Sequence, residues 1–251
     1  MVKLIYGLAK FSNFKYGFGS KPKNLDKKKF LIKIKKKFKI FECADIYKES
    51  IDYVKFLKDK DVHFKISKLP IEKNEKKIED YFRTKIKYYN KSHNTKEIKV
   101  LYLHENSLKI ISNYKVIKVL KKLKKDKIVK NFGVSIYSEN ELIFAIKNNL
   151  YKYIQIPLNL ADSYFFFKYK KKLSKKIIIA RSIVLQGTLL NSVNKKNFQN
   201  QIEKYKKKID NICNNYRISR EELVYRYLFS LKGLDYAIIG SINLKNLKNI
   251  I

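Results

Sequence analysis

Residues Ile40 to Ser50 read I-F-E-C-A-D-I-Y-K-E-S, a stretch that indicates the fold of the whole chain. A short apolar run leads into a polar turn and then into residues with helical character. Glu42 lies in the run, and Tyr47 follows five residues later. This order of strand, turn and helix is the repeating unit of barrel enzymes, which carry their chemistry at the strand ends.

The same unit recurs along the chain, since short apolar runs alternate with helical stretches. We expect strands at Lys3–Ala9, Phe38–Ala44, Val62–Lys68, Ile98–His104, Val129–Ser135, Tyr153–Pro157, Ile177–Ser182 and Tyr236–Ser241. We expect helices at Leu25–Lys36, Tyr47–Lys58, Ile71–Asn90, Ile111–Lys124, Ser138–Asn148, Ser163–Leu173, Asn197–Asn215 and Ser219–Leu231. Alternation implies parallel strands joined by right-handed crossovers.

Eight such units close most naturally into a (β/α)8 TIM barrel, an α/β fold forming a single domain over residues 1–251. The alternative is a doubly wound open sheet. That alternative lacks its usual dinucleotide fingerprint, because no G-x-G-x-x-G follows any of the expected strands.

Composition narrows the class of protein. The chain has 251 residues, of which 45% are apolar, and no apolar run reaches the roughly 18 residues that a membrane span needs. Met1 to Ala9 resembles a first strand rather than a secretion signal, so we expect a cytoplasmic protein. The two cysteines, Cys43 and Cys213, suggest neither a disulfide framework nor a metal site.

The net charge of +36 raises the alternative of a nucleic-acid binder that acts by charge alone. Only five of the 58 basic residues are arginine, although base and phosphate recognition favours the guanidinium group. The abundant lysines instead indicate a general bias of the amino-acid composition toward lysine on solvated faces. We therefore expect no specific nucleic acid among the partners, while the field still attracts anionic ligands.

Four titratable groups follow one another at successive strand ends. Glu42 and Tyr47 belong to the second strand, Lys68 to the third and His104 to the fourth. In a closed barrel these groups converge, and a lysine cation then lowers the pKa of the tyrosine. Each has a structural alternative, such as a surface tyrosine or a core histidine. Together they indicate a proton-transfer site.

Seven motifs in chain order then carry a family resemblance. They are A-D-I-Y (Ala44–Tyr47), S-K-L-P (Ser67–Pro70), L-Y-L-H (Leu101–His104), N-F-G-V-S-I-Y-S (Asn131–Ser138), Y-I-Q-I-P-L-N (Tyr153–Asn159), A-R-S-I-V-L-Q-G-T-L-L (Ala180–Leu190) and A-I-I-G-S (Ala237–Ser241). This ordered set resembles the aldo-keto reductases, in particular a bacterial branch with an R-S-x-x-L-Q-G motif. The resemblance covers nearly the whole chain.

The resemblance implies an enzyme that reduces an aldehyde, ketone or sugar carbonyl to an alcohol. NADP(H) is the implied cofactor, with NAD(H) as the alternative, and a small carbonyl compound is the implied partner of a monomer or weak oligomer. The implied catalytic residues are Tyr47 as proton donor, Lys68, His104 and Glu42. The implied cofactor-binding residues are Ser135, Gln155, Arg181, Ser182, Leu185, Gln186, Gly187, Gly240, Ser241 and Asn246, and no metal is expected.

The chain departs from the family pattern in several places. Glu42 stands where the family has its catalytic aspartate, and Lys48 replaces the glycine after the tyrosine. The sequence ends at Ile251, short of the family's usual terminal helix and tail. The alternative function is therefore a catalytically degenerate barrel that binds a nucleotide or sugar ligand without turnover.

Overall fold

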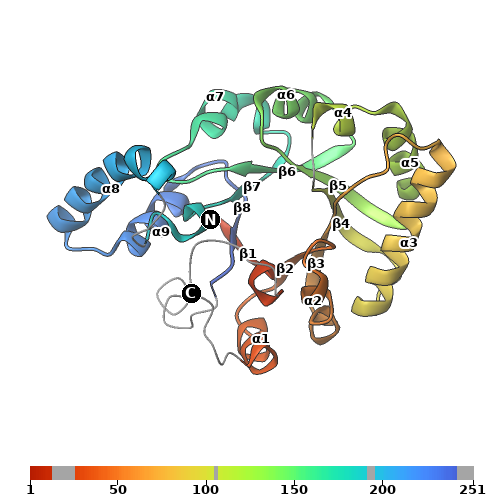
Figure 1. Cartoon of the computed structure of the whole chain (residues 1–251), viewed down its shortest axis with the longest axis horizontal. Coiled ribbons are helices and arrows are strands. Elements are labelled where there is room, and N and C mark those ends of the chain that lie inside the picture. The colour runs from red at the N-terminus through yellow and green to blue at the C-terminus, as the bar shows by residue number, and fades with distance from the viewer. Residues whose placement is uncertain (13–25, 105–106, 191–195, 242–251) are drawn as a thin grey trace.

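A computed structural model describes residues 1–12, 26–104, 107–190 and 196–241. Its strands form a closed barrel in the order β1 to β8, every neighbouring pair parallel, with helices outside the strands (Figure 1). The strands are β1 (Lys3–Gly7), β2 (Ile40–Ala44), β3 (Asp61–Ile66), β4 (Ile98–Leu103), β5 (Val129–Ser135), β6 (Tyr151–Pro157), β7 (Ile177–Arg181) and β8 (Tyr236–Ile239). The predicted single-domain (β/α)8 barrel is confirmed.

The helices follow the prediction with local differences. They are η1 (Ala9–Phe11), α1 (Lys27–Lys35), α2 (Lys48–Ile51), η2 (Val54–Leu57), α3 (Glu75–His93), α4 (Leu108–Ile111), α5 (Tyr114–Lys125), α6 (Glu139–Lys147), α7 (Tyr164–Leu173), η3 (Leu185–Gly187), α8 (Lys196–Tyr216) and α9 (Arg220–Ser230). The long helix expected from Tyr47 to Lys58 is instead two short ones, α2 and η2.

Polar caps explain where two of the other helices begin. The side chain of Asn74 accepts a hydrogen bond from the backbone of Lys77, so α3 begins at Glu75 rather than directly after Pro70. The side chain of Asn113 caps α5 in the same way, so the helix expected from Ile111 begins at Tyr114, and Ile111 ends α4 instead. None of the described helices is long and apolar enough to cross a membrane.

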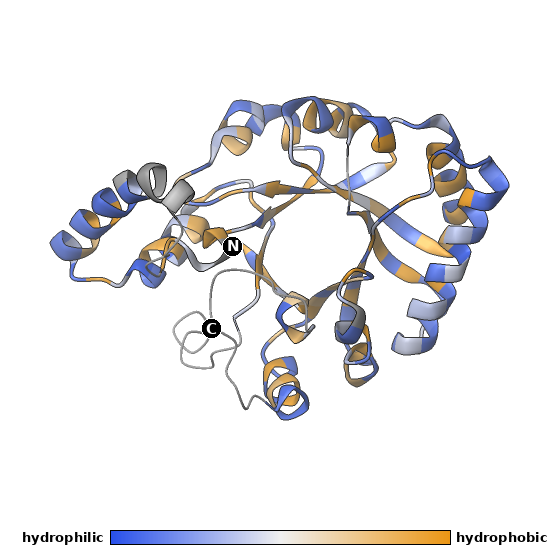
Figure 2. Ribbon diagram, in the orientation of Figure 1, coloured by the Kyte–Doolittle hydropathy of each residue, from blue (hydrophilic) through white to orange (hydrophobic). Residues whose placement is uncertain are grey.

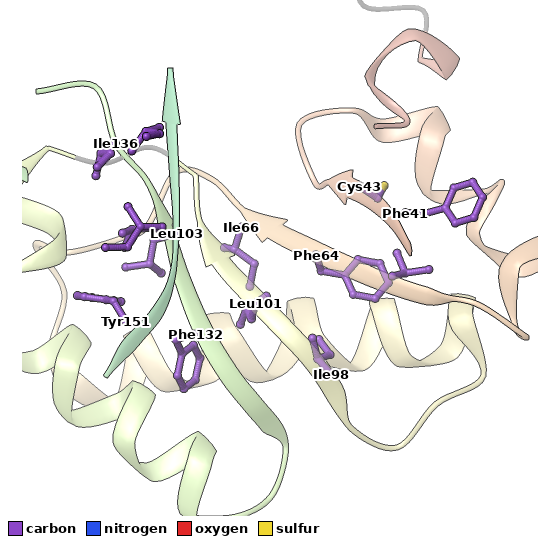
Figure 3. Packing of buried hydrophobic residues seen from close by; sticks show 14 of the residues in the cluster. Phe41, Cys43, Phe64, Ile66, Ile98, Leu101, Leu103, Phe132, Ile136 and Tyr151 are labelled. Atoms are coloured by element: carbon purple, nitrogen blue, oxygen red, sulfur yellow. The ribbon is translucent and has the colours of Figure 1, made fainter. Parts of the chain in front are cut away.

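Each strand has an outer face that packs on the helices. On β3 this face consists of Val62, Phe64 and Ile66, all buried in the main hydrophobic cluster. Figure 3 shows Phe64 and Ile66 beside Leu101 and other outward residues of the neighbouring strands. The helices present hydrophobic residues to this layer and carry hydrophilic ones elsewhere (Figure 2). The alternation of side chains along a strand leaves the intervening residues facing the barrel axis.

The interior of the barrel holds a second, smaller cluster. Ile5, Val100, Tyr102 and Ile179 are its buried members. Gly133 is required beside Tyr102, because a Cβ atom at that glycine would lie 2.4 Å from the tyrosine ring. This interior cluster fills the middle of the barrel, so a ligand would bind beyond it, at the carboxyl ends of the strands.

Candidate active site

A cavity of about 300 Å³ opens at the carboxyl ends of the strands, beyond the interior cluster. Its floor and walls come from the inward positions at the carboxyl ends of the strands. These positions are Gly7, Glu42, Lys65, His104, Ser135, Arg181 and Gly240. The volume lies at the lower end of the range for small-molecule sites, about 300–1,000 Å³. Residues from seven of the eight strands' ends therefore face one space.

A buried ion pair lies at one side of this cavity. Lys65 Nζ is 2.9 Å from Glu42 Oε1, and both side chains are almost fully buried, at 5% and 6% exposure. The second carboxylate oxygen of Glu42 accepts a hydrogen bond of 2.6 Å from Gln155 Nε2. The Glu42 carboxylate thus binds two partners at once, so each of its oxygens has an ion-pair or hydrogen-bond partner.

Burial lowers the pKa of Lys65, while the carboxylate of Glu42 opposes this shift. The ammonium and carboxylate each lose hydration, and each compensates the other only while both are present. The pair is therefore sensitive to the loss of either member.

We expect Glu42→Gln to destabilise the protein by about 3–5 kcal/mol, because it leaves the Lys65 ammonium buried without a counter-charge. The folded Lys65 then has a pKa below that of the unfolded chain, about 10.4. Between the folded and the unfolded pKa of Lys65 the unfolded state binds more protons. The free energy of unfolding should therefore recover as the pH rises toward the unfolded pKa. Urea unfolding at several pH values measures this, and a loss independent of pH would contradict it.

The structure places Lys65, not Lys68, at the mouth of the barrel. Lys68 lies two residues past the end of β3, has a left-handed backbone (φ 53°) and an exposed side chain, and does not line the cavity. The reason is the alternation of the strand. Val62, Phe64 and Ile66 face the helices, so His63 and Lys65 face the barrel axis.

Tyr47 and His104 lie together at the cavity. Tyr47 occupies the N-cap position of α2 and is 7% exposed, and its ring centroid is 6.0 Å from that of His104, edge to face. Burial lowers the pKa of His104 to about 3, with smaller contributions from the cations Lys65 and Arg181. The imidazole is therefore neutral at physiological pH.

Ser67 fixes one nitrogen of this imidazole. Its Oγ is 2.9 Å from His104 Nδ1, and its own backbone is held on both sides. The Ser67 N–H donates to Asp45 Oδ1, and its carbonyl accepts from Tyr81 Oη, each at 2.9 Å. Asp45, from the A-D-I-Y motif, thus ties the turn after β2 to the end of β3. It is also paired with Lys85 at 3.3 Å.

Arg181 lies across the cavity at the end of β7. Its guanidinium stacks on the ring of Tyr137 at 4.0 Å and donates a 2.6 Å hydrogen bond to the carbonyl of Ile136. Arg181 Nε is buried without a hydrogen-bond partner among the described residues. The planar cation therefore already has an aromatic partner within the chain.

The other residues expected at the cofactor divide into three groups. Ser135, Ser182, Gly187, Gly240 and Ser241 line the cavity together with Arg181. Gln155 and Leu185 do not line it, and the Gln155 amide nitrogen is bound to Glu42. For Gln186 the structure describes the backbone alone, and Asn246 lies outside the described residues.

Several cavity residues were not anticipated from sequence. Lys65 was detectable, because V-H-F-K-I-S-K alternates and puts His63, Lys65 and Ser67 on one face. Lys10, Glu221 and Tyr225 carry no sequence signal, since they reach the cavity from η1 and α9 rather than from strand ends. Among the described residues no group of histidine, cysteine and acidic side chains forms a metal site.

The chain was compared with protein families, with curated proteins and with solved structures. The sequence matches the family model described as "Aldo/keto reductase family" over residues 3–251. A search of curated proteins gives no match. Among solved structures, the fold is similar to a glycerol dehydrogenase from Gluconobacter oxydans (14% identity, TM-score 0.71), covering 98% of this chain and 84% of that one. It is also similar to an aldo/keto reductase from Klebsiella pneumoniae in complex with NADP and acetate (12% identity, TM-score 0.68), covering 98% and 83%.

Proposed function

We propose, for a chain that belongs to the aldo/keto reductase family, that it reduces the carbonyl group of a small molecule to an alcohol with NADP(H) as cofactor. The observation that carries this proposal is the placement of Tyr47 and His104 on one cavity beside the buried pair of Glu42 and Lys65. A phenol, an imidazole and an ammonium at one barrel mouth form a proton-donating site for a carbonyl oxygen.

The residues present fit a nicotinamide cofactor. Arg181 Nε is a buried donor without a partner among the described residues, and the cavity wall beside it carries Ser135 and Ser182. Gly187 and Gly240, which lack side chains, border the same space. We propose that Ser135, Arg181 and Ser182 hold the nicotinamide end, while Gly187, Gly240 and Ser241 bind the phosphates and the adenosine end.

In the proposed reaction, NADPH when bound would supply the hydride that the carbonyl carbon receives. Tyr47 donates its phenolic proton to the carbonyl oxygen, so that an alcohol results. Lys65 stabilises the phenolate that remains, because a nearby cation favours the charged form. Glu42 holds Lys65 in place, and Gln155 holds the far oxygen of Glu42. Lys65 thus takes the role that the sequence assigned to Lys68.

His104 orients the carbonyl oxygen in this proposal. A neutral imidazole has one N–H, and only the tautomer with that proton on Nε2 can donate to a substrate. The Ser67 hydroxyl supports this tautomer when it donates to Nδ1. Ser67 is therefore a positioning residue, which acts through His104.

We expect Ser67→Ala to lower kcat by about tenfold, the value of one net hydrogen bond, because both tautomers of His104 become accessible. The KM for NADPH should change little, and Ser67→Thr should restore the rate because it restores the hydroxyl. Nitrogen-15 NMR of the histidine ring reports the tautomer directly. If Ser67→Ala leaves the ring nitrogen shifts of His104 unchanged, Ser67 does not set the tautomer.

The proposed function is tested by following NADPH absorbance with a panel of aldehydes, ketones and sugars. Turnover of any of them, with an alcohol as product, supports the proposal. A parallel fluorescence titration with NADPH and NADH measures which nucleotide binds more tightly. Binding of a nucleotide with no oxidation across the panel would overturn the proposal in favour of a barrel that binds without turnover.

That second candidate has one observation in its favour. Gln155 was expected to bind the nicotinamide carboxamide. Its Nε2 instead donates a hydrogen bond to Glu42, and the residue is buried and does not line the cavity. A degenerate barrel would still bind its ligand after loss of Tyr47, whereas an active enzyme would lose a measured rate.

A further inference from the structure

The charges that line the cavity do not balance locally. Among the described residues five charged side chains border it, namely Lys10, Glu42, Lys65, Arg181 and Glu221. Glu42 and Lys65 neutralise each other at 2.9 Å. Arg181 is bound to a carbonyl and a tyrosine ring, neither of which carries a negative charge. Two cations therefore remain against the single carboxylate of Glu221.

Lys10 belongs to the side of the cavity that holds the proposed proton donor. It lies in η1, directly after β1, and the Leu8 N–H donates a 2.9 Å hydrogen bond to the carbonyl of Glu42. Helix η1 also packs against α2, whose N-cap is Tyr47. Phe11, the last residue of η1, is fully buried and anchors this segment in the core.

The ammonium of Lys10 is partly desolvated. Burial lowers its pKa, and no carboxylate among the described residues pairs with it. An ammonium that has lost hydration without gaining a counter-ion binds an anion more strongly than a solvated surface lysine does. His104 is neutral and therefore repels neither anions nor cations. An acidic group of the substrate can thus approach Lys10 from the side of the cavity where the proposed reaction takes place.

We propose that Lys10 binds an acidic group of the carbonyl substrate, so that the substrate is an anionic carbonyl compound that carries a carboxylate or a phosphate. This inference rests on the proposed function and adds to it the class of substrate. Arg181, at the opposite strand end, remains with the cofactor. A phosphate of the dinucleotide is the other source of the same chemistry, and the experiment separates the two.

The test compares substrates that differ in one charged group. The pairs are 4-oxobutanoate with butanal, and glyceraldehyde 3-phosphate with glyceraldehyde. We expect kcat/KM of the wild type to favour one acidic member by about 10- to 100-fold, the effect of one charge-assisted hydrogen bond. Lys10→Met should reduce this ratio at least about tenfold, and Lys10→Arg should retain most of it. Lys130→Met, an exposed lysine of β5 outside the cavity, is the matched control.

Two outcomes overturn the inference. One is a wild type without preference for either acidic substrate. The other is a Lys10→Met variant with an unchanged ratio but a raised Kd for NADPH, which would assign Lys10 to the dinucleotide.

A binding measurement separates failure of the inference from failure of the proposed function. Calorimetry of 4-oxobutanoate and of glyceraldehyde 3-phosphate with protein saturated by NADP uses no turnover. Binding that Lys10→Met abolishes, with no oxidation of NADPH by any substrate, would remove the proposed function and retain an anion site at Lys10. Turnover of the neutral aldehydes alone would retain the function and remove the anion site.

Discussion

Lys65→Met should lower kcat by about 10²- to 10⁴-fold, the range that a positioned proton donor contributes, while Lys68→Met changes it less than about twofold. The difference follows from position. Lys65 is buried in the cavity wall and paired with Glu42, whereas Lys68 is exposed beyond the strand end. Without the Lys65 cation, the phenolate of Tyr47 forms beside an uncompensated carboxylate, which raises the energy of the transition state.

Steady-state rates with a saturating carbonyl substrate measure this effect. Lys65→Met also leaves Glu42 buried without a cation, so thermal unfolding and NADPH binding must be recorded for both variants. A folded Lys65→Met that binds NADPH but has lost its rate locates the defect in the chemistry. A severe loss in Lys68→Met with Lys65→Met active would return the catalytic role to the lysine of the S-K-L-P motif.

Tyr47→Phe should lower kcat by a similar factor, about 10²- to 10⁴-fold, because it removes the proposed proton donor and retains the ring. The ring contact with His104 and the packing above α2 persist, so the variant should fold and bind NADPH as the wild type does. Stopped-flow measurement of hydride transfer, with NADPH bound beforehand, isolates the chemical step from cofactor exchange.

Tyr88→Phe provides the control for Tyr47→Phe. Tyr88 lies on α3 with 49% of its surface exposed and does not line the cavity, so the loss of its hydroxyl should leave the rate unchanged. Equal rates for the wild type and Tyr47→Phe would show that another group protonates the carbonyl. His104 could not do so as an imidazolium, because burial keeps its pKa near 3.

The glutamate at position 42 determines which residues surround its carboxylate. Its carboxylate binds Lys65 on one side and Gln155 on the other, so the longer side chain has a partner at each oxygen. Gln155, in turn, is withdrawn from the cavity. The positions of Lys65 and Gln155 therefore both depend on the length of the glutamate side chain at position 42.

Local sequence patterns predicted most of the fold. Apolar runs of strand length, alternating with amphipathic helical stretches, require parallel strands with covered faces, and eight of them close into a barrel. Glu42, Tyr47 and His104 were predicted to lie at one site in the same way, because each lies in or near the end of an apolar run, and they do line one cavity. Helix boundaries were less well predicted. Short polar caps such as Asn74 and Asn113 decide them within one turn.

The choice between Lys65 and Lys68 needed both the sequence, whose alternation groups Lys65 with His63 and Ser67 on one face, and the structure, which shows where that face points. The motif S-K-L-P selects Lys68 by resemblance, but a strand has two faces, and a lysine reaches the barrel axis only from the inward one. The outward packing of Val62, Phe64 and Ile66 against the helices decides which face that is. Lys10 and Glu221 depend still more on tertiary structure, since they come from η1 and α9 and line the cavity together with the strand ends. A chain thus encodes its strands and helices through neighbours in sequence, whereas the register and facing of each side chain come from burial that only the closed barrel provides.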